Sequence, residues 1–234
     1  MAKTKIDWCD KVWNPIHGCM KISEGCRFCY AEKMARRLQG IPLSGYNAGF
    51  NITYRPERYK LPLKWKKPSL IFVDSMGDLF HRLIALSAII EIFDIMRIAY
   101  WHTFLILTKR SNLMLEKSPH LNWEDNIWMG VSVENKEYIG RINDLKRSGA
   151  KHKFISFEPM LGPIPNLIEN LNGINWVILG GENGQPSRPC YSPWYENVRD
   201  ACDKLNIPFF FKGFGGGHKY VGKWQQFPEE MKKQ

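Results

Sequence analysis

Six short apolar runs, separated by segments long enough for a helix, constrain the fold of this chain more than any other feature. Each run is rich in β-branched or aromatic residues, which is typical of strands buried on both faces of a parallel sheet. Parallel strands need right-handed crossovers, so the repeated units wind into either an open α/β sheet or a barrel. The runs occupy residues 70–74, 103–108, 127–133, 153–158, 176–181 and 207–212.

Helical patterns fill much of the remaining chain. Apolar residues recur at helical spacing over 82–100, and cap signals favour helices at 136–147 and 193–205. Residues 30–38 are a further helix candidate that ends at a glycine.

The length of 234 residues suits a chain that buries a substantial core. We expect residues 1–234 to form one domain, with an irregular basic and aromatic insertion at 41–67 and a C-terminal extension at 213–234. Six cysteines are too few for a disulfide scaffold, and the first residues lack the apolar core of a signal peptide. Charged residues interrupt the apolar region 83–100, which argues against a membrane span. We therefore expect a cytoplasmic protein without membrane association.

Polar residues follow each of the six runs. In a parallel barrel the chemistry gathers at the C-terminal ends of the strands, so these residues would meet at one end. Any soluble barrel needs polar caps at its strand ends, but six in series favour a lined pocket. The residues are Asp74, Ser75, Asp78, Thr108, Lys109, Arg110, Ser132, Glu134, Asn135, Ser156, Glu158, Gly180, Gly181, Glu182, Asn183 and Lys212.

Three cysteines, Cys19, Cys26 and Cys29, lie within one short loop. Three thiolates can hold three corners of a four-iron cluster, which leaves the fourth iron free to bind a small molecule. Structural zinc is the alternative, because it takes four ligands, and Cys9 or His17 could supply the fourth.

The loop GCMKISEGCRFCYAEKMARR resembles the cysteine loop of the radical S-adenosylmethionine superfamily, including the aromatic Phe28 before the last cysteine. The usual spacing there is three and two residues, so the first gap of this chain departs from it. The blocks KIDWCDKVWNPIHGC, DSMGDLFH, ILTKR, GVSVEN, ISFEPMLGPI, VILGGENG and PFFFK resemble a family of small phage and bacterial proteins assigned to that superfamily. ILTKR and GVSVEN are also distantly similar to the spore photoproduct lyase branch, which repairs DNA.

The resemblance implies a partial parallel (β/α) barrel of about six strands with an iron–sulfur cluster at its top. Cys19, Cys26 and Cys29 would ligate a [4Fe-4S] cluster, and S-adenosyl-L-methionine would chelate the open iron. Electron transfer into the sulfonium then yields a 5′-deoxyadenosyl radical, and the protein positions the cofactor. The chain would thus be an enzyme that needs an electron donor such as flavodoxin or ferredoxin.

Strand-end residues would hold this cofactor. The carboxylates and hydroxyl after the first run suit its ammonium, the polar residues after the third run suit its ribose, and the glycine pair permits close approach. The GGE sequence lies later than in the wider superfamily and would line the substrate side. The cofactor-binding residues so expected are Asp74, Ser75, Asp78, Ser132, Glu134, Asn135, Gly180, Gly181 and Glu182.

Lys109, Glu158 and Lys212 are the candidate catalytic residues. The lysines, with Arg110, either bind an anionic substrate group or pair with Glu158 or Glu182 and hold the barrel top together. Glu158 is a candidate proton acceptor.

The net charge of +10 favours a polyanionic partner. Residues 59–68 combine lysines with an aromatic, and more lysines follow Lys212; lysines bind phosphates, and aromatics stack on unpaired bases. A solvated loop has a similar composition. We expect a nucleotide or nucleic-acid substrate and a monomer; the alternatives are a zinc-stabilised, non-catalytic nucleic-acid-binding protein and an inactive scaffold.

Overall fold

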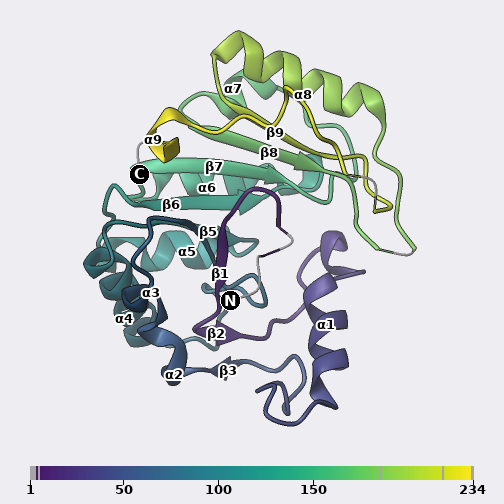
Figure 1. The fold of residues 1–234 in the computed structure, drawn as a ribbon. Coiled ribbons are helices and arrows are strands. Elements are labelled where there is room, and N and C mark those ends of the chain that lie inside the picture. The colour runs from purple at the N-terminus through teal and green to yellow at the C-terminus, as the bar shows by residue number, and fades with distance from the viewer. Residues whose placement is uncertain (1–3, 5, 185, 218, 233–234) are drawn as a thin grey trace.

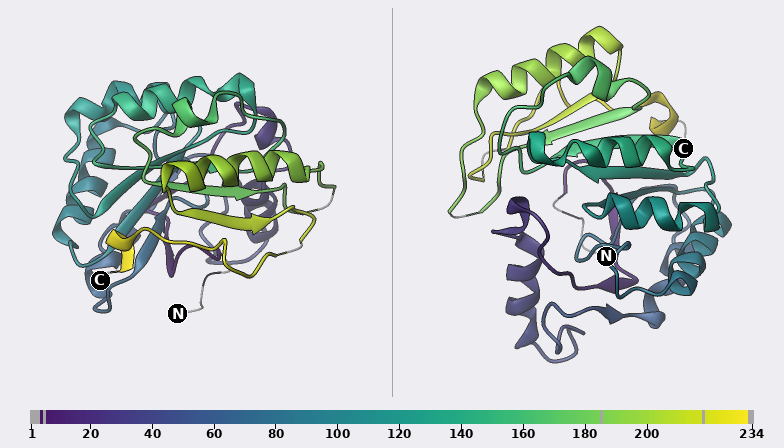
Figure 2. Two further views of the ribbon diagram at one scale, coloured as in Figure 1. Left: turned by 90° about the horizontal axis from the view of Figure 1, so that it is seen from above. Right: turned by 180° about the vertical axis from the view of Figure 1, so that it is seen from behind.

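The computed structural model describes residues 4, 6–184, 186–217 and 219–232. Seven parallel strands form one sheet in the order β1-β4-β5-β6-β7-β8-β9. Figures 1 and 2 show that this sheet curls into a half-barrel. The predicted partial parallel barrel is therefore confirmed. The ends of the expected domain, residues 1–3 and 233–234, and residue 218 of the expected extension lie outside the described residues.

All six apolar runs form strands of this sheet. The seventh strand, β1 (Lys11–Trp13), pairs in parallel with β4 and has too few residues to show a sequence pattern. A separate antiparallel pair, β2 (Ile16–His17) and β3 (Thr53–Tyr54), lies beside the cysteine loop. The six predicted strands are β4 (Leu70–Val73), β5 (Thr103–Thr108), β6 (Ile127–Ser132), β7 (His152–Phe157), β8 (Trp176–Gly180) and β9 (Phe209–Gly213).

The helices include all four that the sequence predicts. The helix expected at 82–100 begins only at Leu86, because Ala85 is extended and residues 81–84 form a turn. Short elements also occur within the expected irregular segment 41–67. The helices are α1 (Tyr30–Gln39), α2 (Pro56–Tyr59), α3 (Leu61–Lys64), α4 (Leu86–Ile98), α5 (Ser111–Lys117), α6 (Gly140–Arg147), α7 (Leu167–Leu171), α8 (Ser192–Leu205) and α9 (Glu229–Lys232), with 3₁₀ turns at Glu24–Cys26, Ser118–His120 and Lys136–Tyr138.

The sheet has an apolar core on each face. Helices α4 to α8 cover the outer face (Figure 2). Apolar strand residues pack against these helices. Inner-face side chains form a second core inside the half-barrel. Trp8 packs on Phe72 in this core, with ring centroids 4.6 Å apart. Burying each such large side chain contributes about 1.5–3 kcal/mol. The buried members of this inner core are Trp8, Cys9, Phe72, Leu105, Trp128, Phe154, Trp176, Ile178, Phe210 and Met231.

The inner face changes from apolar to polar along each strand. Alternate residues of a strand share a face, so Phe154, Ser156 and Glu158 point inward in order along the β7 strand and its end. Gly130 of the neighbouring β6 leaves room for the Phe154 ring, since a Cβ there would lie 2.4 Å from a ring carbon. The aromatic side chains thus close the half-barrel at one end, and the polar side chains gather at the other end, where strands β4 to β9 finish. We call this second end the polar end.

Within the described part of the chain, no helix combines the length and the hydrophobicity needed to cross a bilayer.

Candidate iron–sulfur site at the polar end

The loop that carries the three cysteines enters the polar end at Gly18. The Gly18 amide donates to the carbonyl of Met76 (2.9 Å), just beyond β4. Gly18 has a φ of +94°, and a Cβ there would lie 2.1 Å from the carbonyl oxygen of Asn51. Only glycine fits this conformation and this space, so the backbone fixes where the loop begins.

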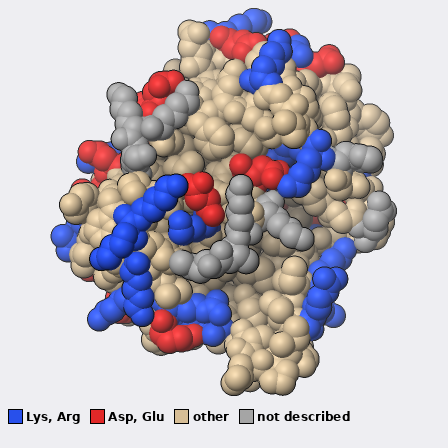
Figure 3. Space-filling model, viewed as in Figure 1, with Lys and Arg blue, Asp and Glu red and all other residues tan. Residues whose placement is uncertain are grey.

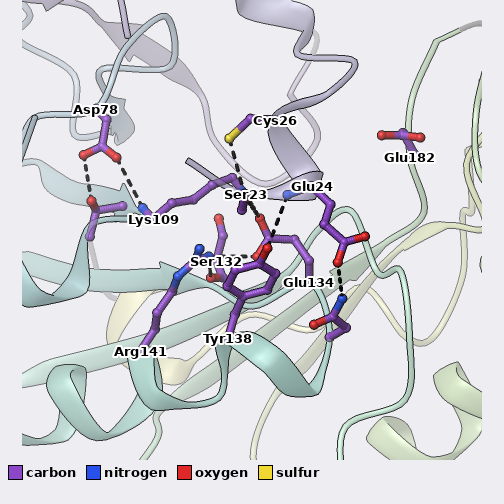
Figure 4. A network of polar contacts seen from close by, with 12 residues as sticks. Ser23, Glu24, Cys26, Asp78, Lys109, Ser132, Glu134, Tyr138, Arg141 and Glu182 are labelled. Carbon is purple, nitrogen blue, oxygen red and sulfur yellow. Dashed lines mark hydrogen bonds and ion pairs between the residues drawn. The ribbon is translucent and has the colours of Figure 1, made fainter. Parts of the chain in front are cut away.

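Glu134 anchors the loop from the end of β6. Its carboxylate is fully buried and accepts hydrogen bonds from Ser23 Oγ (2.5 Å), Lys109 Nζ (2.7 Å) and Arg141 Nη1 (2.8 Å) (Figure 4). Burial alone would raise the pKa of Glu134, but the charges of Lys109 and Arg141 hold that pKa below its ordinary value. Gly25 sits directly on the carboxylate, since a Cβ at Gly25 would lie 2.5 Å from Oε1. Every oxygen of Glu134 thus has a protein partner.

Glu24 ties the same turn to the segments that follow β6 and β8. Its amide donates to the Tyr138 hydroxyl (3.3 Å), and its carboxylate accepts from Asn135 Nδ2 (3.0 Å), both beyond β6 (Figure 4). Its carbonyl accepts from Arg188 Nη2 (2.9 Å). Arg188 in turn donates to the buried carboxylate of Glu182 through Nε (2.9 Å) and Nη2 (2.5 Å). The GGE sequence therefore supports the cysteine loop through Arg188.

Arg110 contacts the loop from beyond β5. Its Nη1 donates to Cys19 Sγ (3.2 Å) and to Asp78 Oδ2 (2.9 Å), and its Nη2 donates to the Met20 carbonyl (2.7 Å). Asp78 is buried and also accepts from Thr108 Oγ1 (2.6 Å). Asp78 is thus committed to protein donors, Arg110 among them.

Asp74 and Ser75, the other residues expected to meet an ammonium, differ in exposure. Asp74 is buried with a φ of +53°; its Oδ1 accepts from the Ile16 amide (3.3 Å), while its Oδ2 has no partner among the described residues. Burial raises the pKa of Asp74 well above its ordinary value. Ser75 is half-buried; its hydroxyl donates to Asn14 Oδ1 (3.2 Å), and its carbonyl accepts from the Tyr30 hydroxyl. Only Ser75 of the two is open to a ligand.

Lys212 and Glu158 form an ion pair at the ends of β9 and β7. Gly180 of the intervening β8 makes this possible, because a Cβ there would lie 3.3 Å from Lys212 Cβ and 3.5 Å from Glu158 Cδ. Asn183 Nδ2 lies 3.4 Å from Glu158 Oε1. Lys109 pairs with Glu134 instead, so the three candidate catalytic residues divide into two groups.

Gly181 and Ser132 meet protein groups. A Cβ at Gly181 would lie 1.9 Å from the Phe214 carbonyl oxygen, so the glycine permits two backbone segments to approach. Ser132 is buried, and its carbonyl accepts from Arg141 Nη1 (2.7 Å). These contacts explain the role of both residues in the fold without any ligand.

Sequence reasoning missed four residues that hold the loop: Ser23, Tyr138, Arg141 and Arg188. Ser23 lies 111 positions from Glu134, and Arg188 lies 164 positions from Glu24. No local pattern marks such pairs. Arg141 lies 7 positions after Glu134, and this short separation was the one sign in the sequence that the two residues could pair.

The three thiols suit an iron–sulfur cluster. Burial and the charge of Asp78 raise the pKa of Cys19 to about 11, while Arg110 opposes that rise. Burial also raises the pKa of Cys29, and N–H groups at the start of α1 lower it. The charge of Cys26 also raises the pKa of both Cys19 and Cys29. Cationic and N–H donors beside thiols stabilise the thiolates that a cluster requires.

A single metal ion fits less well. Among the described residues, no three His, Cys, Asp or Glu side chains are gathered closely enough to hold one ion. Cys9 lies in the inner core near Trp8, and burial raises its pKa to about 12. The buried His17 ring lies on Tyr46, with centroids 4.3 Å apart, and burial lowers its pKa to about 4. Neither residue completes a tetrahedral zinc site with the loop cysteines.

Two hollows mark the surface. One of about 210 Å³ adjoins the cysteine loop and is lined by Phe28, Tyr30, Lys33, Met34, Arg37, Asn183 and Gly184. A larger groove of about 830 Å³ lies between α7 and α8 and contains none of the predicted site residues. The smaller hollow is the one beside the cysteine loop, although none of the residues expected to bind a cofactor or to act in catalysis lines it either.

Comparisons with known proteins confirm the fold. A double mutant of spore photoproduct lyase with bound AdoMet and dinucleoside spore photoproduct superposes with a TM-score of 0.51 and 12% identity, covering 87% of this chain and 63% of that one. A single mutant of the same enzyme gives a TM-score of 0.50 with the same identity and coverage. This chain thus spans less than two thirds of those chains, and the likeness shows that it shares the half-barrel fold of spore photoproduct lyase.

Comparison of the sequence with protein-family models identifies the family. No curated protein matches the chain. A family model described as "Protein of unknown function (DUF5131)" matches residues 3–232, and the chain therefore belongs to the DUF5131 family.

Proposed function

We propose that this protein is a radical S-adenosylmethionine enzyme. The observation that carries the proposal is the position of three thiols on a loop anchored at the polar end of a half-barrel of that type. Cys19, Cys26 and Cys29 would hold a [4Fe-4S] cluster. When bound, the cluster and S-adenosyl-L-methionine would supply a 5′-deoxyadenosyl radical, with electrons from a carrier such as flavodoxin or ferredoxin.

The protein groups around the loop would orient these cofactors. Glu134, Arg188 and Arg110 fix the loop through hydrogen bonds between protein groups. Preorganisation of this kind lowers the cost of reaching the reactive geometry. The partly exposed Ser75 and Asn135 remain candidates for polar contacts with the cofactor.

The Lys212–Glu158 pair is the proposed contact point for substrate. Both side chains are half-buried at the polar end, and neither belongs to the set that anchors the loop. An anionic substrate group could replace Glu158 as the partner of Lys212, which would leave Glu158 available to accept a proton. Lys109 is held by Glu134 and would act on the loop.

A nucleotide or nucleic-acid substrate is favoured by the surface near the loop. The guanidinium or ammonium groups of Arg27, Lys33 and Arg188 lie 5.3 to 5.6 Å from the Phe28 ring. Aromatic rings beside cations suit unpaired bases and their phosphates. Figure 3 shows Lys and Arg side chains over α1 and around α2 and α3 on the same face. A base inside a duplex would have to be flipped to reach this site.

Anaerobic reconstitution tests the proposal. The protein should bind iron and sulfide in a cluster and release 5′-deoxyadenosine after reduction, and nucleotides or single-stranded nucleic acid should stimulate that release. Cys26→Ala is the control and should lose both properties. A colourless wild-type protein with one equivalent of zinc would contradict the proposal and support the zinc-stabilised binding protein.

A further inference from the structure

Arg110 is a charged residue that touches a cysteine of the loop directly. Its side chain is 6% exposed, and its Nη1 lies 3.2 Å from Cys19 Sγ. The other two thiols have weaker neighbours: the Ser23 hydroxyl lies 3.5 Å from Cys26 Sγ, and backbone N–H groups at the start of α1 reach Cys29. The loop therefore presents three unequal sulfur ligands.

Asp78 holds Arg110 in this orientation. The Asp78 carboxylate accepts from Arg110 Nη1 (2.9 Å), Thr108 Oγ1 (2.6 Å) and the amides of Phe80 (3.1 Å) and Lys109 (3.3 Å). An arginine side chain keeps its proton in proteins, and the buried ion pair with Asp78 fixes where that charge lies. The guanidinium is therefore a fixed charge as well as a fixed donor.

A guanidinium beside a cluster ligand affects the reduction potential. A reduced cluster carries one more negative charge than an oxidised one, and a nearby cation stabilises it more at short range and in a partly buried site. Hydrogen bonds to the sulfurs act in the same direction. Both effects raise the potential, which makes the cluster easier to reduce.

We propose that Arg110, held by Asp78, is a positioning residue that raises the reduction potential of the cluster through Cys19. The inference rests on the proposed cluster at Cys19, Cys26 and Cys29. It assigns Arg110 to the cluster itself, in addition to its bond to the Met20 carbonyl.

Redox titration of the reconstituted protein, followed by electron paramagnetic resonance, tests this inference. Arg110→Gln removes the charge and should lower the midpoint potential, and Arg110→Lys keeps a charge without the rigid fork and should give an intermediate value. Asp78→Asn removes the opposing negative charge, while its amide oxygen can still accept from Arg110 and hold the guanidinium in place, so the midpoint should rise. Arg27→Gln is the matched control: this exposed cation of the same loop contacts no thiol among the described residues, so its loss should shift the midpoint much less.

The outcomes distinguish the role of Arg110 from the proposed enzyme function. Equal midpoints in wild type, Arg110→Gln and Asp78→Asn, each with a full cluster, would overturn the role of Arg110 and leave the enzyme proposal intact. Failure of the wild type to assemble a cluster would overturn both. If Arg110→Gln does not fold, the opposite shifts expected for Arg110→Lys and Asp78→Asn decide the matter.

Discussion

Replacing Glu134 with alanine should destabilise the protein strongly. The carboxylate is fully buried between Lys109 and Arg141, whose side chains are 20% and 9% exposed. Removing one partner of a buried ion pair costs about 3–5 kcal/mol, because the remaining charge stays buried. Lys109 can still reach solvent, so we expect about 3 kcal/mol. At about 2–4 °C per kcal/mol for a chain of this size, the melting temperature should fall by roughly 6–12 °C.

Thermal unfolding followed by circular dichroism measures this effect on the cluster-free protein. Asp125→Ala is the matched control, because it also removes a lysine's carboxylate partner, but its side chain is 82% exposed and Lys151 is 52% exposed. The control should have about the same melting temperature as the wild type. Equal melting temperatures for Glu134→Ala and Asp125→Ala would refute the view that Glu134 anchors the loop.

The effect should also depend on pH. The pKa of Glu134 is lower in the folded protein than in the unfolded chain, so the folded state gains stability from the ionised carboxylate. That gain is fully present above the unfolded pKa of about 4.3 and disappears as the pH falls through the lower folded pKa. Denaturant unfolding at several pH values should therefore show the difference between wild type and Glu134→Ala shrinking below pH ~4.

Three further variants test separate features. Cys29→Ala should fail to assemble a four-iron cluster by iron and sulfide analysis, because two thiolates hold it poorly. Gly181→Ala should lower the free energy of unfolding by about 1–3 kcal/mol or more, since its Cβ would lie 1.9 Å from a backbone oxygen, whereas Gly140→Ala has open space and should not. Asp74→Asn should gain stability over wild type as the pH rises above ~4, because the raised pKa of the buried Asp74 penalises its ionised form; an equal difference at pH 4 and pH 8 would contradict this.

The sheet could be predicted because its strands are buried on both faces. Runs such as residues 104–107 and 176–180 contain no polar side chain, so they stand out without any alignment. Strand β1 escaped notice because its three residues have no pattern of their own, and its pairing with β4 is a tertiary contact. The start of α4 was placed too early because Leu83 and Ile84 continue its apolar spacing through a turn.

The candidate site residues could be chosen from the sequence, but their contacts with one another could not. The cysteines and the strand-end carboxylates were identifiable by type and position. Glu134 was expected to meet a ribose, yet its oxygens bond to Ser23, Lys109 and Arg141. Which of two acids faces a ligand and which supports a loop depends on partners that are distant in sequence, and a single sequence does not reveal them.

The hydrogen bonds that anchor the cysteine loop bear on whether the chain needs the proposed cluster in order to fold. Small zinc domains unfold when chelators remove their metal, because the metal supplies the folding energy. Here Glu134, Arg188 and Arg110 bind the loop to the strand ends through bonds that involve no metal. We therefore expect the chain to complete its fold without the proposed cluster, and a chelator that removes that cluster should leave the protein folded.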